Sequence, residues 1–491
     1  MKTDRFTIKF LPDAVEAKAQ KGETVLAAAI DAGIYINSSC GGDGVCGRCK
    51  VIINKGNFKT QPSGRISQEE KKKGYVLACL TTVQGDLEVL VPEESRLDFN
   101  RLSAQDADLL RLKGVYSQVE EVDAGKPIID EKVFVHSPFA DKSHLGVAFD
   151  IGTTTVTGQL VELKTGKILG TKATYNRQAV FGSDVISRIV YASEQGGLEQ
   201  LHRAVIDNIN EIIRELAGEN KIKPDDIMAV MVAGNTTMIY LLLKEDPSRI
   251  RKAPYNTVAN FPVRRAIEAG ITVNPHGLLA CIPGVSSYVG ADTIAGVIAC
   301  GIADKEELSL LIDIGTNGEM ALGNSEWLVC CAASAGPAFE GSGVGCGMRA
   351  AKGAIEDISI DRKGLKLDIK VKTIGNEKPK GICGSGYIDA LAEMLKAGII
   401  DKNGKIDKRI ASARIRTGLD GMELIVAFKN ETAVGKDIVI TEADIENLKR
   451  SKGAIYSACE SLVRKVGVNL SDIKKIYVAG GFGVSLDMEK A

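Results

Sequence analysis

Residues 147–155 read Val147-Ala-Phe-Asp-Ile-Gly-Thr-Thr-Thr155, and residues 311–319 read Leu311-Ile-Asp-Ile-Gly-Thr-Asn-Gly-Glu319, a near copy. In each copy an apolar segment typical of a strand leads into an aspartate and a Gly-Thr turn. A second apolar segment follows each turn, at 156–163 and at 320–322. Because a repeat of this kind indicates duplicated structural units, we predict two similar half-domains that are each built on this hairpin.

The chemistry suited to this turn is the binding of Mg²⁺ and phosphate. Asp150 and Asp313 can hold Mg²⁺ directly or through its water ligands, and can organise an attacking water. Gly152 and Gly315 let backbone N–H groups face phosphate oxygens, to which the hydroxyl groups of the turns can also donate. Glu319 is a candidate base, and an exposed hairpin glutamate is the alternative. The other residues expected to line the phosphates are Thr153, Thr154, Thr316, Asn317 and Gly318.

Two more glycine-rich stretches support a nucleotide site. One contains Gly384, Ser385 and Gly386 and precedes a helical pattern at 387–396, and a glycine loop before a helix favours anion binding. The other follows a predicted helix at 442–466 and a predicted buried strand. Either stretch alone is equally well explained as a strand-to-helix turn, but together with the duplicated turn they favour ATP. The glycines of the second stretch are Gly480, Gly481 and Gly483.

No Gly-x4-Gly-Lys-Ser/Thr motif occurs in the chain, so the sequence excludes a P-loop nucleotide site. A single Asp-x-Gly-Thr turn would be weak evidence, since such turns are common in hairpins. Two copies with the same flanking strands are much stronger evidence for a phosphate-binding turn.

Four cysteines near the N-terminus have the spacing of an iron–sulfur site: Cys40, Cys46, Cys49 and Cys79. The glycines between the first three permit the chain to wrap closely around an inorganic core. The alternative is a four-cysteine zinc site, but structural zinc favours two short Cys-x2–4-Cys pairs. The seven other cysteines have no comparable spacing and are expected to be buried. Expected strands at 6–10, 50–53 and 87–91, with a helix at 23–32, fit a small β-grasp fold.

The composition is that of a globular protein, with 44% apolar and 25% charged residues among 491. The net charge of −1 shows no basic excess, which argues against a nucleic-acid partner. The sequence has neither a membrane-spanning run nor a secretory signal, so we expect a cytoplasmic protein. The stretch 92–145 is polar, with a short helical pattern at 104–112. We therefore predict a [2Fe–2S] domain at 1–95, a linker at 96–145 and an ATPase domain at 146–491.

The cysteine run resembles that of adrenodoxin-like [2Fe–2S] ferredoxins. The duplicated turn resembles that of the ATPase superfamily of actin, sugar kinases and heat-shock chaperones. This resemblance implies an α+β ferredoxin β-grasp domain followed by an α/β, duplicated, actin-like (ribonuclease H-like) ATPase domain. The superfamily's phosphate-1, phosphate-2 and adenosine motifs would then be 150–155, 313–319 and 480–483. Eight residues follow Gly483, which is short for this superfamily.

The combination of both domains resembles the reductive activators of corrinoid proteins, which serve methyltransferase and O-demethylase systems in anaerobes. The strings that carry this resemblance lie at 181–189, 234–238, 288–292 and 382–386. The resemblance implies an ATP-hydrolysing iron–sulfur activase that passes an electron to the Co(II) form of a corrinoid protein and regenerates Co(I). It also implies a [2Fe–2S] cluster, ATP and Mg²⁺ as cofactors, and an external electron donor. Asp184 and Asp292 are candidates for a supporting position behind the site, with helix capping as the alternative role.

Three other functions stay open on the sequence alone. The first is a small-molecule kinase of the same superfamily with a redox-sensing cluster. The second is an electron carrier whose transfer does not depend on ATP. The third, an activase for a radical-type dehydratase, is less well supported because no cysteine pair after residue 146 is suitably placed. The sequence also leaves open whether the chain forms a homodimer.

Overall fold

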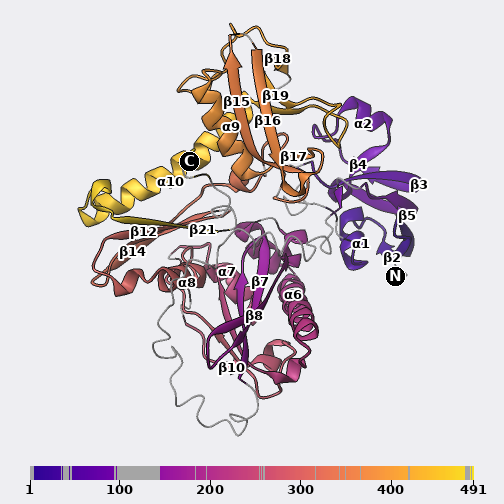
Figure 1. The fold of residues 1–491 in the computed structure, drawn as a ribbon. Coiled ribbons are helices and arrows are strands. Elements are labelled where there is room, and N and C mark those ends of the chain that lie inside the picture. Colours follow the sequence, from indigo (N-terminus) through magenta and orange to yellow (C-terminus); the bar gives the residue numbers. More distant parts are fainter. Residues whose placement is uncertain are drawn as a thin grey trace. The chain divides into compact units, whose positions relative to one another are not determined.

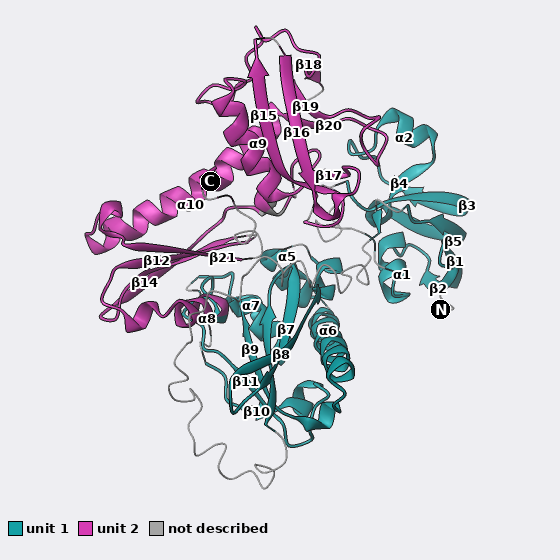
Figure 2. Ribbon diagram, viewed as in Figure 1, with its two compact units in different colours: residues 1–107, 123–291 teal, residues 108–122, 292–491 magenta. Residues whose placement is uncertain are grey.

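The described residues of this computed structural model form two compact units, the first ending at Ala291 and the second beginning at Asp292 (Figure 2). The expected helix at 104–112 lies outside the described residues. The boundaries predicted near 95 and 145 stay predictions. The structure describes residues 5–34, 36, 44, 47–92, 95–96, 144–182, 184–194, 196–253, 255, 257, 260–315, 317–341, 343–348, 350–364, 366–418, 421–480, 487 and 489–490.

The N-terminal region of the first unit folds as a mixed sheet with two helices, which confirms the β-grasp expectation. Among its described strands β1 and β5 run parallel at the centre and the outer pairs run antiparallel. Helix α1 packs its alanine and valine face into the core, which includes Ile8, Val51 and Val89. In sheet order the strands are β2 (Val15–Gln20), β1 (Arg5–Leu11), β5 (Thr81–Leu90), β3 (Lys50–Thr60) and β4 (Tyr75–Leu77), and the helices are α1 (Val25–Asp31) and α2 (Gln68–Lys72).

Strand β3 is longer than the predicted 50–53. Its apolar alternation ends near Ile53, where the prediction stopped, and most of the following side chains are exposed. The backbone nevertheless continues to pair with β5 as far as Thr60, across two register shifts. Main-chain pairing therefore extends this strand where the side-chain pattern gives no signal.

The rest of the first unit contains a second sheet, drawn in purple and magenta beside α6 in Figure 1. Hairpins join β6, β7 and β8, while β9 lies parallel to β6 and β11 lies parallel to β9. The strands in sheet order are β10 (Arg264–Arg265), β11 (Leu278–Cys281), β9 (Ile227–Gly234), β6 (Leu145–Ile151), β7 (Thr155–Glu162) and β8 (Lys167–Tyr175), and the helices are α5 (Val185–Ala192), α6 (Gly197–Asn220) and α7 (Thr236–Leu243).

Helix α6 covers β7 and β8 because its sequence places apolar residues on one face. Leu201, Val205, Ile209, Ile212 and Leu216 recur at the spacing of three and four that aligns side chains along a helix, and all are buried. They form a core with the inner faces of β6, β7 and β9.

The second unit repeats the same topology, which confirms the predicted duplication. Strands β12, β13 and β14 form successive hairpins, and β21 lies parallel to β12 just as β9 lies parallel to β6. Helices α8 and α10 belong to this part. The bounds are β12 (Ser309–Ile314), β13 (Gly318–Gly323), β14 (Leu328–Ala333), β21 (Lys475–Ala479), α8 (Ala291–Cys300) and α10 (Glu442–Val466).

The prediction that the strand before Gly480 is buried was wrong. Among the described strands β21 pairs only with β12, so it is an edge strand, and Ile476 is 56% exposed. An apolar sequence of this kind is typical of a buried strand, but the position at a sheet edge leaves this strand partly exposed. Helix α10, by contrast, has the predicted bounds.

A further part of the second unit, between β14 and β21, contains two smaller sheets with α9 packed on β15. Tyr387 of α9 and Ile355 of β15 are both fully buried in its core. The bounds are β15 (Ala354–Lys363), β16 (Lys366–Thr373), β17 (Gly381–Ile382), β18 (Ile415–Gly418), β19 (Gly421–Ala427), β20 (Ile438–Thr441) and α9 (Gly384–Lys396).

Asp444 ties α10 to the glycine loop at 343–347. Its side chain accepts hydrogen bonds from the backbone N–H of Thr441 at 3.0 Å and of Gly345 at 2.7 Å. It is buried and completes a capping box with Thr441. We expect Asp444→Ala to lower the free energy of unfolding by about 2–3 kcal/mol, because a cap and a buried charged acceptor are lost together.

The measurement is urea unfolding followed by circular dichroism. Glu446→Ala is the control, because Glu446 is exposed on the same helix, and a change within about 0.5 kcal/mol is expected there. Equal losses in the two variants would contradict the role of Asp444.

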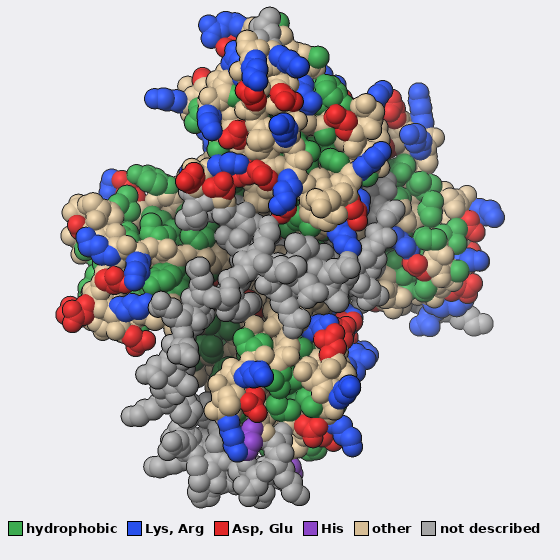
Figure 3. Space-filling model, viewed as in Figure 1, with side chains coloured by type: hydrophobic (Ala, Val, Ile, Leu, Met, Phe, Trp, Pro, Cys, Tyr) green, Lys and Arg blue, Asp and Glu red, His purple; other side chains and the backbone are tan. Residues whose placement is uncertain are grey.

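On the face shown in Figure 3 acidic and basic side chains are interspersed over the described surface, in keeping with the net charge of −1. Among the described helices, none combines the length and apolar character that crossing a membrane requires.

Candidate functional site

The first Gly-Thr turn joins β6 to β7. Asp150 is exposed near the end of β6, opposite Thr157 of β7 and beside Ala233 of β9. Gly152 donates its backbone N–H to the carbonyl of Thr155 at 2.9 Å, which closes the turn. The side chains of Thr153 and Thr154 are partly exposed. The structure therefore brings the predicted residues of this copy together in one tight turn.

The second Gly-Thr turn gathers acidic side chains. Asp313 of β12 lies directly opposite Glu319 of β13, and Gly315 donates to the carbonyl of Asn317 at 2.9 Å. Glu319 is partly buried, so it is not the exposed hairpin glutamate considered above. Thr316 lies outside the described residues.

Asp292, in the first turn of α8, is electrostatically coupled to this pair. Burial, and after it the charge of Asp292, raise the pKa of Asp313 to about 6. Burial, Asp292 and then Asp313 raise the pKa of Glu319 to about 8. Burial also raises the pKa of Asp292. The three carboxyl groups thus disfavour one another's ionised forms, and a bound cation would relieve this repulsion.

Among the described residues, no three His, Cys, Asp or Glu side chains are placed to hold a metal ion by themselves. The facing carboxyl groups of Asp313 and Glu319 suit Mg²⁺, which is usually held by one or two carboxylates, water and substrate phosphates.

Gly480 brings the end of β21 against the second turn. Its φ of +90° lies in the left-handed region, and a Cβ there would lie 2.7 Å from Oδ1 of Asp313 and 2.5 Å from the carbonyl oxygen of Ile314. Only glycine fits this approach without displacing the carboxylate. Gly318 is buried at the start of β13. The other adenosine-motif glycines, Gly481 and Gly483, lie outside the described residues.

We expect Gly480→Ala to fold and to bind ATP at least about tenfold more weakly, since its methyl group would push Asp313 aside. The measurement is the rise in unfolding temperature that ATP-Mg²⁺ produces. Gly467→Ala is the matched control, because Gly467 has a similar φ of +74° but open space around a Cβ. The same loss of the ATP effect in both variants would show that backbone strain, and not the contact with Asp313, is responsible.

Gly384, Ser385 and Gly386 do not form the predicted loop. They are the buried first turn of α9, which begins at Gly384 and not at Tyr387. A Cβ on Gly386 would lie 2.3 Å from the carbonyl oxygen of Ile355, so these small residues let α9 pack closely on β15. The hydroxyl of Ser385 reaches the carbonyl of Glu356 at 3.3 Å. Close packing explains the glycines here, and their contact with a nucleotide stays a prediction.

The cysteine site is described in part. The sulfurs of Cys49 and Cys79 are 3.2 Å apart and both side chains are buried. Two thiolates on one tetrahedral metal ion are about 3.8 Å apart, whereas a disulfide requires about 2.05 Å. Gly44 and Gly47 have positive φ, as close wrapping of the loop requires. Cys40 and Cys46 lie outside the described residues.

The environment of Cys49 favours a thiolate. The hydrogen bond to Cys79, opposed by burial and assisted by the backbone N–H groups of Cys79 and Ala78, lowers the pKa of Cys49 to about 7. Two buried sulfurs that are close together, with backbone donors around them, fit a thiolate-held metal centre.

Two residues that contact the first Gly-Thr turn, Asn235 and Arg188, were not among the sequence-based candidates. Asn235 donates to the hydroxyl of Thr153 at 3.1 Å, and the fully buried Arg188 donates to the carbonyl of Thr153 at 2.5 Å. The available signal was a second repeat, Val-Ala-Gly, at 232–234 and 478–480. Asp184 caps α5 through the N–H of Ser187, so the capping role is confirmed for it, whereas Asp292 lies with the acidic pair.

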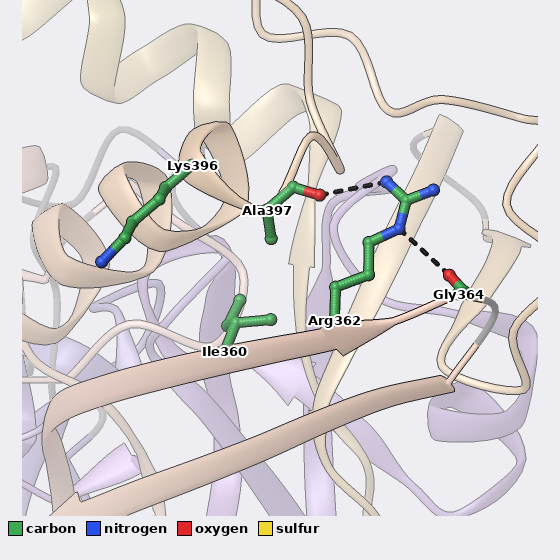
Figure 4. A pocket seen from close by; sticks show the side chains of 5 residues that line it. All are labelled: Ile360, Arg362, Gly364, Lys396 and Ala397. Carbon is green, nitrogen blue, oxygen red and sulfur yellow. Dashed lines mark hydrogen bonds between the residues drawn. The ribbon is translucent and has the colours of Figure 1, made fainter.

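An open pocket of about 470 Å³ lies elsewhere, at the C-terminal end of α9 (Figure 4). Its Arg362 donates to the carbonyl of Ala397, which ties the end of α9 to β15, and to the carbonyl of the nearby Gly364. This pocket lies about 18 Å along α9 from Gly384, and none of the predicted site residues lines it.

Comparison with family models matches three consecutive regions of the chain. The "2Fe-2S iron-sulfur cluster binding domain" matches residues 8–84, the "RACo middle region" matches 145–305, and the "C-terminal domain of RACo the ASKHA domain" matches 307–491. The ferredoxin and actin-like ATPase folds are thereby both identified.

Relatives of known name match over most of the chain. "Corrinoid activation enzyme RamQ" of Eubacterium limosum is 31% identical over 94% of this chain and 83% of its own length. "[Co(II) methylated amine-specific corrinoid protein] reductase" of Methanosarcina barkeri is 28% identical over 70% of this chain and 64% of its own. The solved structure of "Reductive activator for corrinoid,iron-sulfur protein" is 41% identical, with a TM-score of 0.64, and covers 99% of this chain and 88% of that one. The chain belongs to the RACo-type family of reductive activators of corrinoid proteins.

Proposed function

We propose that this protein is an ATP-dependent activase that returns the Co(II) form of a corrinoid protein to Co(I), the state from which methyl transfer proceeds. The observation that carries the proposal is that the 31% identity to a corrinoid activation enzyme runs through both the iron–sulfur and the ATPase regions. Neither region alone would favour this function over the electron carrier or the kinase.

The proposed cluster ligands are Cys40, Cys46, Cys49 and Cys79. A [2Fe–2S] cluster held by them would supply one-electron chemistry. The chain's own contribution is to bury Cys49 and Cys79 side by side and to surround Cys49 with backbone donors that stabilise its thiolate.

The residues that we propose to bind the nucleotide lie on the Gly-Thr turns. Thr153 and Thr154 would face phosphate oxygens with N–H and hydroxyl groups, on the turn that the N–H of Gly152 closes. Asp313 would hold Mg²⁺, and Glu319, whose pKa of about 8 keeps it largely protonated at neutral pH, would be able to accept a proton once a bound cation has lowered that pKa and released its own proton. Gly480 leaves room for this carboxylate arrangement.

ATP is required on energetic grounds if the acceptor couple lies below the donor's potential, as the family resemblance implies. For one electron, each 59 mV of unfavourable difference lowers the equilibrium constant about tenfold. Nucleotide binding can offset this only if ATP has different affinities for two states of the protein. We propose that residues on the Gly-Thr turns respond to which nucleotide is bound.

The test is an anaerobic mixture of the protein, a chemical reductant, ATP-Mg²⁺ and a Co(II) corrinoid protein, followed by the absorbance of Co(I). We expect Co(I) to form with inorganic phosphate as the product of ATP. Transfer of the γ-phosphate to a small molecule, without any change at cobalt, would favour the kinase and overturn the proposal.

A further inference from the structure

The first Gly-Thr turn is held by donors from elsewhere in its unit at three successive carbonyl groups. The side-chain amide of Asn176 donates to the carbonyl of Gly152 at 2.8 Å, and its backbone N–H donates to that of Thr154 at 2.9 Å. Arg188 donates to the carbonyl between them, that of Thr153, at 2.5 Å. Among the described residues, the N–H groups of Thr153 and Thr154 donate to no protein acceptor.

The groups that hold these carbonyls are fully buried. Asn176, Gln178 and Arg188 have no exposed surface, and Arg188 also donates to Gln178 at 3.3 Å and to the carbonyl of Gly182 at 2.9 Å. Burying an arginine and two amides costs free energy unless their hydrogen bonds are satisfied. In return the network fixes one conformation of the turn, in which its carbonyls face the protein and its N–H groups do not.

Asn235 also fixes the orientation of a side chain of the turn, that of Thr153. Its Nδ2 donates to the hydroxyl of Thr153 at 3.1 Å, while its Oδ1 caps α7 by accepting from the N–H of Met238 at 3.0 Å. A hydroxyl group has one proton and two lone pairs. Because Asn235 occupies a lone pair, the single proton of Thr153 is left to point away from Asn235, where it can be donated to an anion.

The two copies of the turn have diverged in just these positions. Asp150 pairs with Ala233 as Asp313 pairs with Ala479, so the counterpart of Asn235 in the second copy is Gly481. Asp150 lies opposite Thr157 where Asp313 lies opposite Glu319. The hydrogen bond from the side-chain amide of Asn235 therefore belongs to the first copy, and the pair of Asp313 and Glu319 belongs to the second.

We propose that Asn235 is a positioning residue for the nucleotide, which aims the hydroxyl proton of Thr153 at a phosphate oxygen while Asn176 and Arg188 hold the turn's carbonyls away from it. This inference rests on the proposed binding of ATP at the turn. It assigns the binding of phosphate to the first copy of the turn.

The test is a double-mutant cycle on ATP affinity with Asn235→Ser, Thr153→Val and the double variant, each as the full-length holoprotein. Serine still caps α7 but is too short to reach Thr153. We expect Asn235→Ser to bind ATP-Mg²⁺ about tenfold more weakly than the wild type, which is the loss of one hydrogen bond to a charged group. In the Thr153→Val background the same change is expected to have no further effect.

The unfolding temperature without nucleotide is expected to stay that of the wild type in Asn235→Ser. Asp246→Ser is the control, since Asp246 also caps a turn of this unit, through Ser248 at 2.9 Å, but is exposed away from the Gly-Thr turn. An equal loss of affinity from Asn235→Ser in both Thr153 backgrounds, or no loss in either, would overturn the inference while wild-type binding of ATP still supports the function. A wild type that does not bind ATP would overturn the proposed function itself.

Discussion

Replacing Cys79 with serine is expected to abolish assembly of the [2Fe–2S] cluster. The side chain is 7% exposed, and its sulfur lies 3.2 Å from that of Cys49, so two predicted ligands lie side by side. Serine keeps the size of the side chain but not the thiolate that binds iron. The measurement is the electron-paramagnetic signal of the reduced protein, together with its iron content.

The ATPase part of Cys79→Ser should still bind ATP, because the cysteine and nucleotide residues belong to separate sheets. Cys300→Ser is the matched control, since Cys300 is a partly buried cysteine on α8, outside the cluster region. It should keep both the signal and the iron. A normal cluster in Cys79→Ser would remove Cys79 from the ligand set.

Replacing Asp313 with asparagine is expected to lower ATP hydrolysis by about 100-fold or more. A carboxylate that organises Mg²⁺ at a transferring phosphate contributes several kcal/mol to the transition state, and asparagine removes its charge while preserving its shape. The close contact with Gly480 is thereby kept. The measurement is the release of inorganic phosphate, with the electron-paramagnetic signal expected to be that of the wild type.

Asp304→Asn serves as the control for Asp313→Asn, because Asp304 is an exposed aspartate of the same unit. It should hydrolyse ATP at the wild-type rate. Hydrolysis at that rate in Asp313→Asn as well would discredit the second Gly-Thr turn as the cation site.

The duplication could be predicted from sequence because the elements that form it are adjacent in the chain. An apolar strand, an Asp-x-Gly-Thr turn and a second strand leave the same pattern wherever they occur, and β6–β7 and β12–β13 follow it closely. Helix α10 was also predictable, since Thr441 caps it and Gly467 ends it.

The failures have physical reasons as well. Gly384 and Gly386 were interpreted as a loop because glycine favours turns, but here the missing side chains allow α9 to pack closely on β15. Strand β21 was expected to be buried because its sequence is apolar, and its position at a sheet edge cannot be read from a single segment.

The buried hydrogen bonds that hold the first turn could not be predicted, for a similar reason. Asn176, Arg188 and Asn235 are far apart in sequence and carry side chains that usually lie at a surface. Only folding brings them to the carbonyls and hydroxyl of the turn. Polar residues with such roles leave no periodic pattern, and a short repeat such as Val-Ala-Gly indicates only where to look.

The coupling of ATP to cobalt reduction is tested most directly by the equilibrium yield of Co(I) at a fixed reductant potential. The yield is measured with the wild type in the presence of ATP-Mg²⁺, without nucleotide, and with Asp313→Asn in the presence of ATP-Mg²⁺. We expect Co(I) to accumulate only in the first of these mixtures. Equal yields of Co(I) with and without ATP would show that the protein is a simple electron carrier and would contradict the account.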